Sequence, residues 1–394
     1  MAGKRGNGEG CIFKNKEGRY EARITKGYNA SGKQQFKYFS AKTREEVKEK
    51  LNSYIEQQKK GTYVEPNKLI LGEWLDSVYE NHIVNKVKTS TRASAESIIA
   101  KHLKPHFGNV RLNELKGTQI QKFYNSLLVD GRIDKKGGLS PKTIKNIHLV
   151  LHGALEQAVK EDLIIKNPLK SVTLPRSHNK EIEILSPEEQ KRLAEKCSDH
   201  PWGMAILLTL YSGMRLGEVL ALTWKDINFD KNILSINKQL SRLKDYSKDA
   251  PAKTKLYLRR ETKTKSSERI IAIAPVIMEK LKLYKQKQDL ERAYWQKCYN
   301  NLNLVFCRDD GNLIDPATFR DFYHRTLKKA GMGHKTFHAL RHTFATRALE
   351  SNAPIKVVSE ILGHASIQIT LDTYSHVSLE LQQETMQRMV DIFF

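Results

Sequence analysis

The sequence predicts an α+β protein with several domains: a small β-sheet with one helix, then an all-helical domain, then a mixed and mainly helical domain. Three observations support this fold class. Side chains alternate with period two between Gly10 and Ser40, helical periodicity takes over from Leu71 to Leu169, and the remainder mixes helical segments with short β segments. A chain of 394 residues is long enough for two or three hydrophobic cores. These patterns place the domains at residues 1–66, 67–173 and 184–394.

The chain is strongly basic, which favours a polyanionic partner. Its 67 Lys and Arg residues outnumber the 44 Asp and Glu residues, for a formal net charge of +23. Nucleic acid is the first interpretation and a membrane surface is the second. The membrane interpretation is weaker because no apolar run approaches the roughly 20 residues that span a bilayer, and the N-terminus lacks a signal-peptide core. We therefore expect a soluble, cytoplasmic protein that binds nucleic acid.

The first domain is predicted to be a three-stranded sheet with one helix. Ala22 and Ile24 share one face of an alternating run, and a second run, KQQFKYF, follows a turn. The segment TREEVKEKLNSYIEQQKKG then predicts a helix capped by Thr43. Basic residues alternate with aromatic residues on the strands, which favours a sheet that reads DNA, whereas the alternative is a solvated face. The DNA contacts that we expect here are Lys14, Arg19, Arg23 and Lys37.

The second domain is predicted to be a bundle of about four helices. In LSPKTIKNIHLVLHGALEQAVKEDLI, Ser140 caps the helix and Pro141 occupies its first position. Similar helical patterns surround LGEWLDSVYENHI, STRASAESIIAKHLK and GTQIQKFYNSLLVDG. Cations and hydroxyls at helix starts suit phosphate, although a solvated surface remains the alternative for each residue. The contacts that we expect from these helix starts are Lys88, Thr89, Thr91, Arg92, Lys142 and Lys145.

The third domain begins with a strong helix start, Ser186-Pro187-Glu188-Glu189, and contains the strand-like segments NILSIN and RIIAIA. In LLTLYSGMRLGEVLALTW, Gly213 ends a helix and the following turn presents Arg215. Glu218 stands three residues later, where its carboxylate can orient that arginine. Taken alone, such a pair is usually structural.

A later helix, TFHALRHTFATRAL, carries a second group of candidate residues. Its apolar stripe places Arg341 at the edge, with His338 beside that edge and His342 farther toward solvent. The spacing lets one imidazole and one guanidinium converge on a single anion. A zinc site formed by His334, His338 and His342 is the alternative, but the glutamate of HExxH is missing. We therefore expect no metal site and no cofactor.

The last candidates follow a helix that Pro354 opens and Gly363 ends. This arrangement places His364 in an exposed turn, and Tyr374 follows ten residues later. Tyr374 shares a helical face with Ile367 and Leu371, so a core residue is the alternative interpretation when it is taken alone.

The joint order of these motifs resembles the tyrosine recombinase (phage integrase) family, in particular the integrases of conjugative transposons. The motifs are SGMRLGE, a lysine in a hairpin, His338-x-x-Arg341, LGH and DTYSHV. The resemblance covers the whole chain. It implies an arm-site DNA-binding domain, a helical core-binding domain and a catalytic domain. It also implies site-specific recombination of double-stranded DNA, which integrates and excises a mobile element.

The resemblance also implies a role for each candidate residue. Tyr374 attacks a phosphodiester to form a 3′-phosphotyrosyl link, and Arg215 and Arg341 hold the non-bridging oxygens. His364 donates a further hydrogen bond to the phosphate, and His338 assists removal of the tyrosine proton. In ETKTKSSERIIAI, Lys263 is the favoured general acid, with Lys265 as the alternative or as a DNA contact.

The same resemblance implies partners and leaves rivals. Four subunits act as a homo-tetramer on DNA, with an excisionase or a DNA-bending protein as accessory factor. The C-terminal segment LELQQETMQRMVDIFF docks on a neighbouring subunit or folds on its own domain. The rival classes are a DNA-binding regulator, a metal-dependent relaxase and a type IB topoisomerase. The filled catalytic positions disfavour the first, the lack of an HxH motif disfavours the second, and the separate sheet domain disfavours the third.

Overall fold

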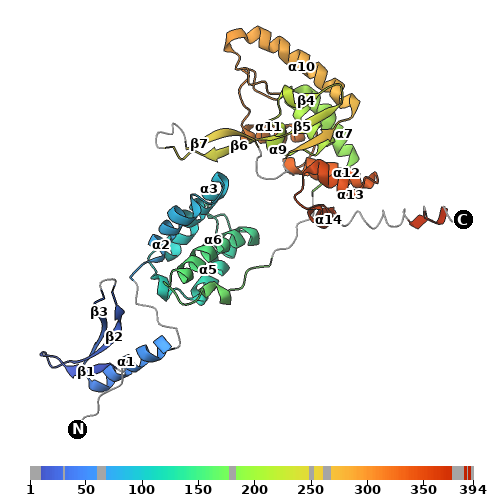
Figure 1. The fold of residues 1–394 in the computed structure, drawn as a ribbon. Coiled ribbons are helices and arrows are strands. Elements are labelled where there is room, and N and C mark those ends of the chain that lie inside the picture. The colour runs from blue at the N-terminus through green and yellow to red at the C-terminus, as the bar shows by residue number, and fades with distance from the viewer. Residues whose placement is uncertain are drawn as a thin grey trace. The chain divides into compact units, whose positions relative to one another are not determined.

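The computed structural model in Figure 1 describes residues 10–29, 32–59, 68–176, 183–247, 253–260, 268–374, 386–387 and 389–391. The chain divides into two compact units, Met1–His178 and Asn179–Phe394. The predicted α+β fold class is correct: the first unit contains a three-stranded sheet with one helix and a separate helical core, and the second unit is mixed and mainly helical. Throughout these ranges, no helix has both the length and the apolar character that a membrane span requires.

The N-terminal sheet is antiparallel and one of its faces is covered by a helix. Ala22 and Ile24 point from the central strand toward Val47 and Leu51 of the helix, and the four side chains are buried together. The helix begins after Thr43, whose Oγ1 accepts a hydrogen bond from the backbone N–H of Glu46 at 3.3 Å. The elements are β1 (Cys11–Lys14), β2 (Tyr20–Tyr28), β3 (Gln34–Ala41) and α1 (Arg44–Lys59), and the strand order is β1-β2-β3.

The helical part of the first unit contains the four predicted helices around its own core. Ser140 caps the last of them as predicted, because its Oγ accepts a hydrogen bond from Thr143 N at 3.2 Å. The indole of Trp74 donates to the carbonyl oxygen of Ala154 at 2.8 Å and ties the first helix to the last. The elements are α2 (Leu71–Val78), α3 (Thr89–Ile98), α4 (Lys104–Phe107), α5 (Gly117–Asp130) and α6 (Pro141–Lys160), with π-helical turns at Tyr79–Ile83 and Ile99–Leu103.

The helix start predicted at Ser186 in the second unit is present, and it forms a capping box. Ser186 Oγ accepts from Glu189 N at 3.2 Å, and Glu189 Oε2 accepts from Ser186 N at 2.9 Å. Two small sheets follow, with orders β4-β5-β8 and β6-β7. The elements are α7 (Pro187–Lys196), α8 (Gly203–Ser212), α9 (Leu216–Val219), β4 (Ile227–Asn228), β5 (Ile233–Ile236), β6 (Lys238–Lys244), β7 (Thr254–Arg260), β8 (Arg269–Ala272), α10 (Pro275–Trp295), α11 (Pro316–Lys329), α12 (Phe337–Glu350), α13 (Ile355–Leu362) and α14 (Ile367–Tyr374).

Helices α8, α12 and α13 form the part of this unit that positions the candidate site. Figure 1 labels α12 and α13. Helix α8 is apolar on almost every side and packs against α12. It ends at Gly213, which has a φ of 63°, and a Cβ there would lie 2.6 Å from Phe344 and 2.7 Å from Leu362. Helix α13 ends at Gly363 with the same φ of 63°. Both predicted helix ends are therefore confirmed, and both bring a backbone carbonyl close to α12.

Candidate active site

Arg341 projects from α12 and is almost fully buried, with 2% of its surface exposed. Helical spacing predicted this residue at the edge of the apolar stripe, and that expectation is wrong. Its Nη1 donates to the carbonyl oxygen of Gly213 at 2.8 Å, and its Nη2 donates to the carbonyl oxygen of Leu362 at 2.7 Å. These carbonyls lie at the C-terminal ends of α8 and α13, where unpaired carbonyl groups carry partial negative charge. The two helix ends therefore compensate the buried cation.

Arg215 enters the site from the turn between α8 and α9. Its Nη1 donates to Glu218 Oε1 at 2.7 Å, and its backbone N–H donates to Glu218 Oε2 at 2.9 Å. Its Nη2 donates to the carbonyl oxygen of Gly363 at 3.1 Å. The predicted pairing with Glu218 is therefore present. About a third of the Arg215 side chain (35%) is exposed, whereas the Glu218 side chain is completely buried.

Glu218 has a second cationic partner, Arg269, which the sequence analysis missed. Arg269 Nη1 lies 3.1 Å from Glu218 Oε1, and Arg269 Nη2 lies 2.7 Å from Glu218 Oε2. Burial opposes ionisation of Glu218, but the hydrogen bonds and charges of Arg269 and Arg215 outweigh it and hold the pKa of this carboxyl below its usual range. A single arginine at the start of a strand gives no signal in a sequence, because its partner stands 51 residues away.

The two histidines of α12 lie beside these arginines. The rings of His338 and His342 are nearly perpendicular, with centroids 4.7 Å apart. His338 is the more exposed and His342 is half-buried, which reverses the expected order. Desolvation within the site, followed by the charges of His342, Arg341 and Arg215, lowers the pKa of His338 to about 4. His338 is therefore a neutral imidazole near pH 7, although solvent still reaches it.

His364 follows the end of α13 and joins the same group. It is half-buried, not fully exposed as expected. Desolvation, followed by the charges of Arg341, Arg215 and the α12 histidines, lowers the pKa of His364 to about 4. Its Nδ1 lies 2.8 Å from Thr370 Oγ1, and Thr370 is fully buried on α14. The structure thus brings four of the six predicted catalytic residues together: Arg215, His338, Arg341 and His364.

Helix α14 carries the fifth predicted residue. It packs against α13 and ends at Tyr374, one helical turn after Thr370. Ile367 and Leu371, which share a face with Tyr374 in the sequence pattern, are 42% and 38% exposed and form no buried stripe. The Tyr374 side chain lies outside the described part of the structure, as do Lys263 and Lys265, which stand between β7 and β8. Sequence reasoning also missed Thr370, whose only signal is its position four residues before Tyr374.

The three histidines of the alternative zinc site, His334, His338 and His342, do not lie together. The ring of His334 stacks on His324 at a centroid distance of 4.5 Å, whereas His338 contacts His342. Among the described residues, no three His, Cys, Asp or Glu side chains are grouped so that they could hold a metal ion.

The expected DNA contacts of the sheet fall on two different faces. Arg23 is paired with Tyr38 across β2 and β3, and its guanidinium lies 4.5 Å from the ring centroid of Phe36 on the open face. Lys37 is instead paired with Ile24, and Lys14 with Tyr20, so the strand register turns both lysines toward the face that α1 covers. Arg19 is exposed in the turn between β1 and β2. The four residues therefore do not form one surface.

The expected DNA contacts of the helical part differ in their exposure and in the residues that they contact. Lys88, Thr91, Lys142 and Lys145 are exposed at the starts of α3 and α6. Thr89 is half-buried. Arg92 donates from Nε to the Tyr79 hydroxyl at 3.1 Å, and its guanidinium lies 5.8 Å from that ring's centroid. Arg92 therefore contributes to packing within this part of the chain.

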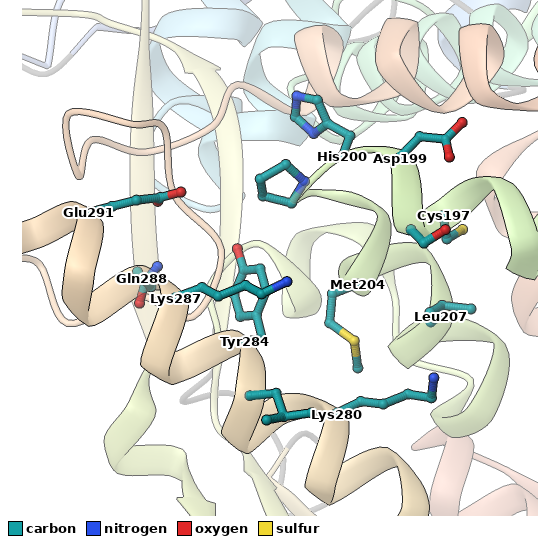
Figure 2. A pocket seen from close by; sticks show the side chains of 13 residues that line it. Cys197, Asp199, His200, Met204, Leu207, Lys280, Tyr284, Lys287, Gln288 and Glu291 are labelled. Atoms are coloured by element: carbon teal, nitrogen blue, oxygen red, sulfur yellow. The ribbon is translucent and has the colours of Figure 1, made fainter.

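Figure 2 shows a separate cleft of about 330 Å³ between the start of α8 and α10. Met204 and Tyr284 form an apolar part of its lining, while Lys280, Lys287 and Glu291 contribute charged groups from α10. Tyr284 is partly buried, and desolvation raises its pKa. The four candidate catalytic residues whose side chains are described, Arg215, His338, Arg341 and His364, do not line this cleft.

Known protein families and relatives match most of this chain. The phage integrase family matches residues 183–380, and the N-terminal SAM-like domain of phage integrases matches residues 70–128. A tyrosine recombinase XerC-like protein of Caldanaerobacter subterraneus subsp. tengcongensis is 30% identical over 390 residues, which cover 96% of this chain and 98% of that protein.

Two sets of solved structures share the fold. An integrase of transposon Tn1549 in complex with transposon right-end DNA has a TM-score of 0.66 at 21% identity, over 82% of this chain and 100% of that chain. A lambda integrase tetramer bound to a Holliday junction has a TM-score of 0.54 at 16% identity, over 94% of this chain and 96% of that chain. The sequence matches extend over most of the chain and include the segments that carry the arginine and histidine motifs. This chain therefore belongs to the phage integrase family, the tyrosine recombinases.

Proposed function

We propose that this protein is a site-specific DNA recombinase that integrates and excises a mobile element by cutting and rejoining DNA through Tyr374. One observation carries the proposal: Arg215, His338, Arg341 and His364 converge where α8 and α13 end, and the His364–Thr370 contact ties α14, which ends at Tyr374, to that point. Two guanidinium groups and two neutral imidazoles on one site suit a phosphodiester.

The cleavage step conserves the energy of the phosphodiester bond. The Tyr374 oxygen attacks phosphorus, the bond from phosphorus to the 5′-oxygen breaks, and a 3′-phosphotyrosyl link forms. A 5′-hydroxyl from another strand then attacks this link, releases the tyrosine and restores a phosphodiester. Neither water nor a nucleotide is consumed in the exchange. Because the reaction needs only proton transfer and charge stabilisation, it requires no cofactor.

The arginines stabilise the negative charge that builds on the phosphate. Arg215 is the more exposed and would contact a non-bridging oxygen first, while Arg341 forms the floor of the site. Their carbonyl bonds to Gly213, Leu362 and Gly363 fix each guanidinium before DNA arrives. A preorganised donor costs little reorganisation in the transition state, and removal of one such donor typically costs about 10²–10³ in rate.

The histidines supply proton transfer and a further hydrogen bond. His338 is neutral near pH 7 because of its lowered pKa, so it can accept the tyrosine proton. In the tautomer in which His364 Nδ1 accepts from the Thr370 hydroxyl, the Nε2 proton can donate to a phosphate oxygen. A bound phosphate anion raises the pKa of both imidazoles toward the range in which they exchange protons readily. Lys263 would protonate the departing 5′-oxygen, with Lys265 as the alternative.

We assign DNA contacts to each proposed domain. Residues 1–66 would bind arm sites through the open sheet face that carries Arg23, residues 67–173 would bind core sites, and residues 184–394 would carry the chemistry. A homo-tetramer would exchange strands pairwise, with an excisionase or a DNA-bending protein as accessory factor. The chain would act on DNA in the bacterial cytoplasm. The C-terminal segment after Tyr374 would dock on a neighbouring subunit or on its own domain.

A nicked suicide duplex tests the nucleophile, because cleavage beside the nick releases a short fragment and traps the covalent link. The unchanged protein should form a denaturant-resistant DNA adduct in excess chelator, and digestion should place the nucleotide on the peptide that contains Tyr374. Tyr374→Phe should bind DNA normally and form no adduct. Arg341→Ala should bind DNA and form little adduct.

Tyr211→Phe is the matched control, because Tyr211 is a 52% exposed tyrosine at the end of α8 in the same domain. This variant loses the same oxygen atom and should form the adduct at the normal rate. The assignment is wrong if the adduct persists in Tyr374→Phe or maps to another residue such as Tyr323. Loss of all activity in chelator, restored by magnesium or zinc, would contradict the metal-free mechanism.

A further inference from the structure

The last three carbonyl groups around the end of α13 each accept a hydrogen bond from a different arginine. Ile361 O accepts from Arg269 Nε at 2.6 Å, Leu362 O accepts from Arg341 Nη2 at 2.7 Å, and Gly363 O accepts from Arg215 Nη2 at 3.1 Å. Two of these arginines belong to the predicted catalytic set. The third, Arg269, comes from β8 and has no assigned role.

Arg269 contacts the site at two separate points. Its Nε reaches the end of α13, while its Nη1 and Nη2 hold both oxygens of Glu218, which in turn hold the guanidinium and the backbone N–H of Arg215. The Arg269 side chain is only 6% exposed. A phosphate bound at the surface would therefore reach Arg215 before it reached Arg269.

Gly363 permits this close approach. A Cβ on Gly363 would lie 3.0 Å from Arg269 Nη1 and 3.1 Å from its Cδ. The guanidinium of Arg269 is therefore packed directly against the residue that precedes His364. Displacement of Arg269 would release the end of α13, and with it the position of His364, as well as one side of Glu218.

We propose that Arg269 is a positioning residue, which holds Arg215 through Glu218 and His364 through the end of α13. This inference rests on the proposed recombinase function, because it concerns the same phosphate site. Arg269 is also the first residue of β8, six residues after Lys263 in the sequence.

Stability alone does not account for this arrangement. The burial of Arg269 together with Glu218 costs hydration free energy, and well-packed apolar residues at such positions are often as stabilising or more so. The arrangement does supply fixed geometry, because the three donors of Arg269 lie in one plane and reach two different elements. A displacement of about 1 Å in a group that contacts the reacting phosphate can cost about 10²-fold in rate.

Arg269→Gln tests the inference on a nicked core-site duplex, with adduct formation followed in single turnover at saturating protein. The rate constant should fall about 30- to 100-fold, because Arg215 and His364 lose their alignment, while the DNA dissociation constant changes by less than about 3-fold. Arg269→Lys keeps the charge but not the planar guanidinium, so its rate constant should lie between that of Arg269→Gln and that of the unchanged protein. Arg347→Gln is the matched control, because Arg347 bonds to Leu185 O and Glu350 away from the site, and its rate should stay near that of the unchanged protein.

A second substrate separates positioning from damage to the fold. A duplex with a methylphosphonate at the scissile position carries no negative charge there, so the arginine clamp loses most of its value. On this duplex the deficit of Arg269→Gln should shrink to less than about 5-fold. An equal deficit on both duplexes, or an unchanged rate on the phosphate duplex, would overturn the inference. If the unchanged protein itself forms no Tyr374 adduct, the proposed function fails instead.

Discussion

Replacement of Glu218 by glutamine is the change that most directly tests how the site is held together. The Glu218 side chain is completely buried, and its two oxygens accept four hydrogen bonds from Arg215 and Arg269. Glutamine keeps the shape but turns one acceptor oxygen into an N–H₂ donor. That group would face donors of both arginines, and no counter-charge would remain between the two cations.

The expected magnitude follows from these contacts. Two of the four hydrogen bonds are lost, and a hydrogen bond to a charged group contributes about 1.5–3 kcal/mol, so the loss is about 3–6 kcal/mol. The removal of one partner from a buried ion pair independently gives about 3–5 kcal/mol. We therefore expect about 4 kcal/mol of destabilisation. In a unit of this size each kcal/mol lowers the melting temperature by about 2–4 °C, so the transition should move down by about 8–16 °C.

Differential scanning calorimetry of the full chain near neutral pH measures this shift. Glu350→Gln is the matched control: it breaks the partly exposed pair with Arg347, so the transition should move by no more than about 3 °C. The effect of Glu218→Gln should also depend on pH. Because the pKa of Glu218 is lower in the folded protein than in the unfolded chain, its charge stabilises the fold above the unfolded pKa of 4.5, and this contribution is lost as the pH falls through the folded pKa. The difference between the two proteins should therefore shrink in acid.

Glu218→Gln should also slow adduct formation about 10- to 100-fold at temperatures well below its transition, because Arg215 is no longer held. A variant that melts within about 2 °C of the unchanged protein and cleaves DNA at the same rate would refute this account of the site. So would a stability loss that grows, and does not shrink, below pH 4.5.

Two further predictions concern DNA binding and pH. A protein that lacks residues 1–66 should still bind and cleave core DNA but should lose affinity for element-end DNA. Its binding to core DNA should weaken steeply as the salt concentration rises, which mobility-shift assays at several salt concentrations measure. If the shortened protein binds both DNAs as tightly as the full chain does, the division of roles is wrong. A fall in pH from about 7.5 to about 5.5 should tighten core-site binding, because bound phosphate raises the low pKa values of His338 and His364 and binding therefore takes up protons. The same fall in pH should slow adduct formation, because protonated His338 cannot accept the tyrosine proton. His338→Gln should flatten the pH dependence of the rate, and a rate that rises in acid would argue against His338 as the base.

Local sequence signals predicted the helix starts and ends correctly where the outcome depends on one nearby residue. Ser140 and Ser186 cap their helices, and Gly213 and Gly363 end theirs, because each choice depends on residues within a single turn. The pairing of Arg215 with Glu218 is likewise three residues apart. The alternation of side chains predicted the three-stranded sheet. It did not predict which face of the sheet Lys14 and Lys37 occupy, because the strand register depends on pairing across the sheet.

The errors within the site have a common physical cause. Helical spacing placed Arg341 at the edge of the apolar stripe, yet Arg341 is buried, because two carbonyl groups from distant helix ends compensate its charge. Arg269 was missed for the same reason, since Glu218 and the end of α13 lie far away in the sequence. Helical periodicity predicts which residues face a core, but it contains no information on which carbonyl groups meet them there.

The ends of α8 and α13 explain how this basic chain assembles its cations before DNA arrives. Three guanidinium groups would repel one another in the empty site, and the negative ends of two helices offset that repulsion with carbonyl oxygens from Gly213, Ile361, Leu362 and Gly363. Glu218 supplies one full negative charge and the carbonyl groups carry only partial charge, so a net positive field remains. Desolvation and then this field lower the pKa of both His338 and His364. The same field favours a phosphate dianion-like transition state over the singly charged ground state. The geometry that keeps the histidines neutral is therefore the geometry that would stabilise the reaction.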